Sequence, residues 1–106
     1  MAADHLVQRW FALTREELPA LSGARGWPVH LDHCFQRILL DNATGGPWRD
    51  TITAPAYRNA SDEQLGLAIA LGEQSIAGEQ DMDLLNDNSL AWRGKGKGRT
   101  NRPGLS

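Results

Sequence analysis

This sequence has very little cysteine and no long apolar run. Its one cysteine, Cys34, cannot form an internal disulfide, and a zinc site would lack the usual cysteine pairs. No apolar run exceeds the five residues 67–71, far below the about 18 that cross a bilayer. The first residues turn polar at once, without the apolar stretch of a signal peptide. We expect a cytoplasmic protein with no membrane contact, no metal and no cofactor.

Common catalytic and cation-binding motifs are missing as well. No serine lies in the sequence context of a nucleophile elbow, and the glycine-lysine repeat at 94–98 lacks the strand and helix of a phosphate-binding loop. The acidic segment 81–87 lacks the glycine and the bidentate glutamate of an EF-hand. These absences argue against a hydrolase, an NTPase and a calcium sensor.

The charge is divided unevenly along a chain of otherwise ordinary composition. With 41% hydrophobic and 23% charged residues, the 106-residue chain has the balance and length of one folded domain. All 13 acidic residues precede position 93, so residues 1–92 carry a net charge of −7 and residues 93–106 carry +5. We predict a single helical domain at residues 1–94 and a flexible basic tail at residues 95–106.

The N-terminal third predicts one helix followed by a separate helical turn. Residues 4–13 place apolar side chains at the three-and-four spacing of an amphipathic helix. Thr14 and Glu17 have the spacing of a capping box, which would open a second short helix. Pro19 fits only near the start of that second helix.

The middle of the chain contains the clearest amphipathic helix. From position 31 to position 44 apolar residues recur at i, i+3, i+4, i+7 and i+8, until Gly45 ends the pattern. The members of this stripe are Leu31, Cys34, Phe35, Ile38 and Leu39.

Two further helices follow a long loop. Ser61 opens the first with a capping box, and the small residues Ala68 and Gly72 would let another helix approach closely. Asp81 or Asp83 begins the last helix, which ends at Gly94.

The fold class that these segments indicate is all-α, a small bundle of about four helices with a long central loop. Its core would be built from the apolar stripes that begin at Leu6, Leu31, Leu65 and Leu84. The alternative is an α+β fold, in which residues 51–53 form a short extended segment.

Reactive side chains are densest at residues 30–37. Cys34 in the first turn of a helix would feel the positive end of the helix dipole, and His30 or His33 would serve as its base. This arrangement is that of a catalytic thiol. The alternative is a buried structural cysteine, because Cys34 also belongs to the apolar stripe.

A second candidate site follows the polar row of the same helix. His33, Arg37 and Asp41 recur at i, i+4 and i+8, so they share one face beside the apolar stripe. We expect a small polar or anionic ligand to bind between this row and the following loop. The alternative is a simple helix ion pair between Arg37 and Asp41. The ligand-binding residues of this hypothesis are Arg37, Asp41, Trp48, Arg49 and Tyr57, with His33 beside them.

The basic tail is the third feature, and its glycines would let the backbone follow a phosphate chain. The alternative is a terminus that only aids solubility. Our leading hypothesis is a small non-enzymatic binding or adaptor module, with a protein partner at its helical body and affinity for nucleic acid or another polyanion in its tail. The competing hypothesis is a small-molecule-binding domain or thiol-dependent enzyme built around Cys34. The polyanion-binding cations of the leading hypothesis are Arg93, Lys95, Lys97, Arg99 and Arg102.

Overall fold

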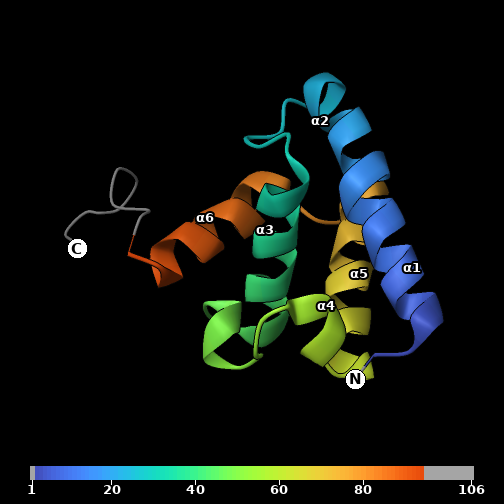
Figure 1. Ribbon diagram of the computed structural model, residues 1–106. Helices are drawn as coiled ribbons and strands as arrows, with labels where there is room; N and C mark the ends of the chain where they lie inside the picture. Colours follow the sequence, from blue (N-terminus) through green and yellow to red (C-terminus); the bar gives the residue numbers. More distant parts are fainter. Residues whose placement is uncertain (1, 95–106) are drawn as a thin grey trace.

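The computed structural model, which describes residues 2–94, is a helical bundle around a central helix, α3 (Figure 1). Helix α5 packs against both α3 and α1, and α6 packs against α3 (Figure 1). The described residues form no strand, which confirms the all-α fold, and residues 51–53 do not form the extended segment. No helix in this part of the chain has both the length and the apolar character needed to cross a membrane. The elements are α1 (Asp4–Ala12), a π-helical segment (Leu13–Glu17), α2 (Leu18–Arg25), α3 (Asp32–Thr44), a 3₁₀ turn (Trp48–Asp50), α4 (Ala56–Asn59), α5 (Asp62–Ile76) and α6 (Met82–Trp92).

The predicted break after residue 13 is wrong, because helical backbone continues from Asp4 to Arg25. The Thr14 hydroxyl donates back to the Trp10 carbonyl oxygen at 2.9 Å instead of capping a new helix. Glu17 accepts from the Arg9 guanidinium, so it is not free to complete a capping box. A single π-helical turn spans the junction, and Pro19 follows it as the second residue of α2.

The core is built on the predicted stripe of α3, although the stripe begins later than expected. Phe35, Ile38 and Leu39 have no exposed surface. Leu31 precedes the first turn of α3 and is 45% exposed, and Cys34 is only partly buried. The first residue of the stripe is therefore outside the core.

The prediction of an apolar inward face for α6 is also wrong, because half of the side chains buried there are polar. Leu84, the residue expected to begin the core stripe of this helix, is 56% exposed. The buried side chains are instead those of Met82, Leu85, Asn86 and Ser89. The spacing of apolar residues does not reveal this face, because two of its four buried side chains are polar.

Helix α5 begins and packs as the sequence predicts. The Gln64 N–H donates to the Ser61 hydroxyl at 3.0 Å, and the Ser61 N–H donates to the Gln64 side chain at 2.9 Å, which completes the capping box. A Cβ added at Gly72 would lie 2.6 Å from Cδ2 of Leu13. The missing side chain therefore lets α5 approach the π-helical segment closely.

Candidate functional site

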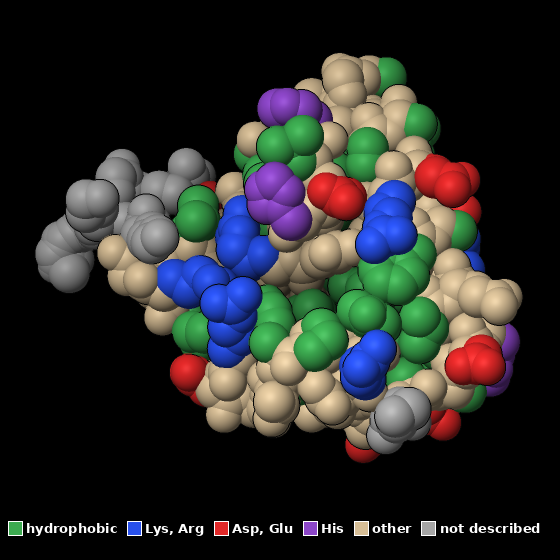
Figure 2. Space-filling view, viewed as in Figure 1, with side chains coloured by type: hydrophobic (Ala, Val, Ile, Leu, Met, Phe, Trp, Pro, Cys, Tyr) green, Lys and Arg blue, Asp and Glu red, His purple; other side chains and the backbone are tan. Residues whose placement is uncertain are grey.

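A cavity of about 730 Å³ opens on the face formed by α1, α3 and the 47–57 loop. Figure 2 shows this face as a recess with apolar side chains at its base and arginine side chains around it. Its volume lies in the range of small-molecule sites. The lining residues are Trp10, Phe11, Arg15, His33, Gln36, Arg37, Leu40, Trp48, Arg49, Ala54, Pro55, Ala56, Tyr57 and Arg93.

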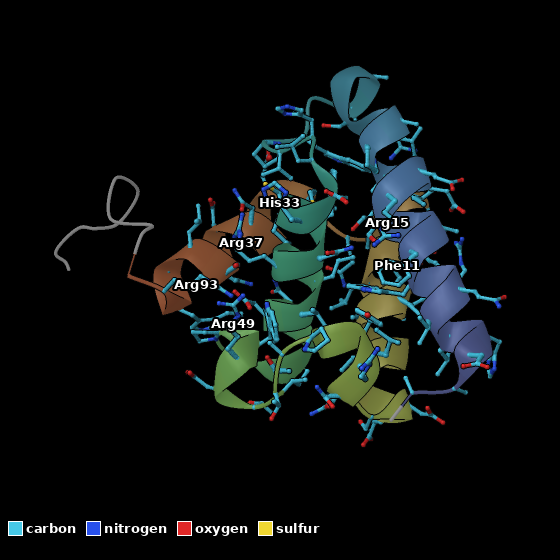
Figure 3. All side chains as sticks on the ribbon, in the orientation of Figure 1. Phe11, Arg15, His33, Arg37, Arg49 and Arg93 are labelled. Atoms are coloured by element: carbon cyan, nitrogen blue, oxygen red, sulfur yellow. The ribbon has the colours of Figure 1, made fainter. Side chains whose placement is uncertain are left out.

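The charged side chains of this lining are all basic. Of residues 2–94, four arginines and one histidine line the cavity, and no aspartate or glutamate does. Arg37, Arg49 and Arg93 lie together at one side of it, whereas Arg15 and Phe11 lie across from them (Figure 3). We call Arg37, Arg49 and Arg93 the arginine cluster.

Asp41 holds part of the arginine cluster in place from behind. Its carboxylate has no exposed surface and accepts from Nε of Arg93 at 2.7 Å and from Nη2 of Arg93 at 2.9 Å. It also accepts from the Ser89 hydroxyl at 2.6 Å and from the Trp48 backbone N–H at 2.9 Å. One carboxylate thus fixes the end of α6, the start of the 3₁₀ turn and a cation of the cavity.

The hydrogen bonds from Arg93 to Asp41 raise the pKa of the Arg93 guanidinium above its ordinary value. Burial opposes this change, but the hydrogen bonds have the larger effect. A raised arginine pKa keeps the guanidinium charged throughout the physiological range.

Arg37 contacts α6 and does not pair with Asp41. Its Nη1 donates to the Ser89 hydroxyl at 2.7 Å, and its Nη2 donates to the side-chain oxygen of Asn86 at 3.0 Å. Both acceptors are neutral, so these contacts orient the guanidinium without neutralising its charge. The two polar residues on the inward face of α6 therefore position a cation of the cavity.

Aromatic rings lie next to the remaining arginines. The Arg49 guanidinium carbon lies 5.1 Å from the Trp48 ring centroid, and that of Arg15 lies 3.9 Å from the Phe11 centroid. The rings of Phe11 and Tyr57 are 5.2 Å apart and tilted by 60°. Among the described residues, no carboxylate lies within ion-pair distance of Arg15, Arg37 or Arg49.

The structure brings together most, but not all, of the residues singled out from the sequence. His33, Arg37, Trp48, Arg49 and Tyr57 line the cavity. Asp41 is buried behind it, and His30 and Cys34 are not among the lining residues. Arg93, assigned to the basic tail, lines the cavity instead of lying apart from it. The other predicted tail cations lie outside the described residues, namely Lys95, Lys97, Arg99 and Arg102.

The wall formed by α1 and the π-helical segment was missed from the sequence. Trp10, Phe11 and Arg15 belong to this wall. The i, i+4 spacing of Phe11 and Arg15 was the available signal, because residues four apart on a helix share a face and an aromatic-arginine pair can stack there. Gln36, another lining residue, links α3 to this wall, since its amide donates to the Thr14 hydroxyl at 3.0 Å.

Neither metal ligation nor similarity to other proteins assigns a role to this site. No group of three or more His, Cys, Asp and Glu side chains within the described part of the chain is arranged to hold a metal ion. No family model, no curated protein and no solved structure matches the chain. The site is therefore interpreted from its own chemistry.

Proposed function

We propose that the protein binds a small anionic ligand in the cavity beside α3. The observation that carries the proposal is the lining itself, with four arginines, one histidine and no carboxylate around a base of aromatic and aliphatic side chains. Guanidinium groups donate two parallel hydrogen bonds to carboxylate or phosphate oxygens, and are therefore preferred at anion sites.

The arrangement of the cluster supports binding more than a structural role. Asp41 neutralises Arg93, but Arg37 has neutral partners and Arg49 packs beside an aromatic ring. Like charges held close together repel, and an anion between them would relieve that repulsion. A bound anion would therefore offset the electrostatic repulsion among the arginines of the cluster.

Arg49 is the residue whose replacement tests the proposal most cleanly. Arg49 is exposed, and its side chain forms no hydrogen bond with the rest of residues 2–94. With inorganic phosphate as the probe, Arg49→Ala should weaken binding by about tenfold or more, the worth of one charge-assisted hydrogen bond. Isothermal titration calorimetry measures the affinity.

Arg58→Ala is the matched control, because Arg58 is exposed on α4 and does not line the cavity. It should leave both phosphate affinity and thermal stability unchanged. Equal loss of affinity in the two variants would indicate non-specific attraction to positive charge. An absence of phosphate, sulfate and citrate binding to the full chain would contradict the proposal.

Polyanion binding through residues 93–102 is a second candidate function, favoured by the position of Arg93. This first cation of the basic stretch lies at the cavity, so a nucleic acid held by the stretch would continue from the anion site. Replacing the four other cations by glutamine in the full chain should abolish salt-sensitive binding of single-stranded RNA or DNA. Unchanged binding between about 50 and about 200 mM salt would argue against this candidate.

A thiol-dependent reaction gains no support from the position of Cys34. His33 and Arg37 line the cavity, but Cys34 does not. Successive helical residues point about 100° apart, so a side chain next to His33 is turned to a different face of α3.

A further inference from the structure

We propose that the ligand is a phosphate monoester attached to a flat aromatic group. This inference rests on the proposed function, because it specifies which anion occupies the cavity. It places the phosphate in the arginine cluster and the aromatic group against the apolar base. A nucleoside monophosphate belongs to this chemical class.

The number of free donors in the arginine cluster favours phosphate over carboxylate. A guanidinium has five N–H groups. Arg37 uses one from each of its two terminal nitrogens, on Ser89 and Asn86, and Arg93 uses two on Asp41. Each therefore retains donors for a ligand, and Arg49 adds its own from the 3₁₀ turn. Three guanidiniums from three separate elements suit the three terminal oxygens of a phosphate monoester better than the two oxygens of a carboxylate.

The charge of the arginine cluster also matches a dianion. Its three cations are offset by one buried carboxylate, that of Asp41, which leaves two formal positive charges. Asp50 also attracts Arg93, but at longer range and from an exposed position. A phosphate monoester near neutral pH carries close to two negative charges. The ligand would complete the charge balance of the site.

The remainder of the cavity requires more than a bare anion. The volume of about 730 Å³ is much larger than one phosphate group needs, and the part between the arginine cluster and Arg15 is walled mainly by apolar side chains. Phe11, Trp48 and Tyr57 all contribute to it. Aromatic rings stack with planar groups, and two of these side chains carry a polar atom that can meet a substituent.

The site thus has two ends of different chemistry. The arginine cluster lies at one end, and the Arg15 guanidinium packed on Phe11 lies at the other (Figure 3). A ligand with its phosphate in the cluster would direct its aromatic group toward Phe11 and Arg15. Arg15 could then donate to a ring nitrogen or carbonyl oxygen of that group.

Calorimetric titration of the full chain with four probes tests this assignment. The probes are inorganic phosphate, phenyl phosphate, benzoate and adenosine monophosphate. Phenyl phosphate should bind about tenfold tighter than inorganic phosphate because it adds aromatic contact, and tighter than benzoate because it presents three terminal oxygens. Adenosine monophosphate should bind at least as tightly as phenyl phosphate.

Two variants separate the ends of the site. Arg49→Ala should weaken inorganic phosphate and phenyl phosphate by a similar factor. Tyr57→Leu should weaken phenyl phosphate about fivefold or more while leaving inorganic phosphate unchanged, because the Tyr57 ring packs against Phe11, at the end of the cavity away from the arginine cluster. Matching thermal unfolding curves for both variants and the parent chain exclude misfolding as the cause, and Phe11→Leu gives a second test of the apolar end.

The outcomes distinguish this inference from the proposed function. If phenyl phosphate binds no tighter than inorganic phosphate, or benzoate binds as tightly as phenyl phosphate, the assignment is overturned while anion binding at the cavity stands. If none of the four probes binds, and sulfate and citrate do not bind either, both proposals fail. If Tyr57→Leu and Phe11→Leu leave the advantage of phenyl phosphate intact, the aromatic end is wrongly placed.

Discussion

Asp41 shows how one buried residue can set the geometry of a cavity that it does not line. Its carboxylate accepts hydrogen bonds from Arg93, Ser89 and the Trp48 backbone, and Ser89 in turn accepts one from Arg37. Three parts of the cavity lining are therefore connected through a single side chain. A buried charge is tolerated here because every partner is close and one of them is a cation.

Removing the charge of Asp41 should therefore be costly. Asp41→Asn is expected to lower the free energy of unfolding by about 3 kcal/mol, because Arg93 loses its ionic partner and several hydrogen bonds weaken. Asp50→Asn should cost less than about 1 kcal/mol, since Asp50 is exposed and acts on Arg93 only at longer range. Urea denaturation measures both values. Equal losses of unfolding free energy would show that the buried Arg93–Asp41 pair stabilises the fold no more than Asp50 does.

Arg37 should affect stability as well as ligand binding, unlike Arg49. Its two hydrogen bonds join α3 to α6, so Arg37→Ala should lower the free energy of unfolding by about 1–3 kcal/mol. Arg49→Ala should change it by less than about 0.5 kcal/mol. Urea denaturation of the two variants without ligand gives the comparison, and a neutral effect of Arg37→Ala would mean that the contacts with α6 do not stabilise the fold.

At the scale of elements, two glycines of α5 should change the stability of the protein in opposite directions when each is replaced by alanine. Gly72→Ala would place a Cβ 2.6 Å from Leu13, so it should destabilise the protein by about 1–3 kcal/mol through overpacking. A Cβ at Gly66, in the same helix, would meet no atom within 4 Å beyond its chain neighbours and the nearby backbone of the helix. Gly66→Ala should therefore stabilise by about 0.5–1 kcal/mol, because alanine favours the helical backbone. Thermal unfolding distinguishes the two signs, and stabilisation by both changes would contradict the close approach of α5 and the π-helical segment.

Helix α6 both packs into the core and binds the Arg37 side chain, so its buried face does not follow a simple apolar pattern. Met82 and Leu85 pack into the core, while Asn86 and Ser89 on the same face hold the Arg37 side chain. A helix that buries polar groups must supply their hydrogen-bond partners from another element. The polar half of this face therefore becomes intelligible only next to α3.

At the scale of the whole molecule, the cavity should be lost together with the core. Its walls come from four separate parts of the chain, and the central helix α3 contributes both to the cavity and to the core. Unfolding followed by tryptophan fluorescence should coincide with unfolding followed by circular dichroism, as for a single cooperative domain. An earlier fluorescence transition would indicate that the cavity wall opens independently of the core.

The extent of the core gives a further whole-molecule prediction. Ile38→Ala should lower the free energy of unfolding by about 2–5 kcal/mol, because the side chain is fully buried. Leu31→Ala should change it by less than about 0.5 kcal/mol, since Leu31 is largely exposed before the first turn of α3. Chemical denaturation of both variants gives the comparison, and similar losses would contradict this boundary of the core.

The sequence alone determined the features that depend on neighbouring residues. Ser61 and Gln64 are three positions apart, so their capping box was visible, and so were the stripe through Phe35, Ile38 and Leu39 and the small residue at position 72. The polar row of α3 likewise pointed to His33 and Arg37, which line the cavity.

Only the tertiary structure decided which partners these residues meet. From the sequence, Asp41 could pair with Arg37 one turn away, but its ionic partner is Arg93, 52 positions along the chain. The wall containing Phe11 and Arg15 likewise faces α3 only after α1 has packed against the bundle. Helical periodicity specifies which side chains share a face, but the packing of separate helices specifies what that face contacts.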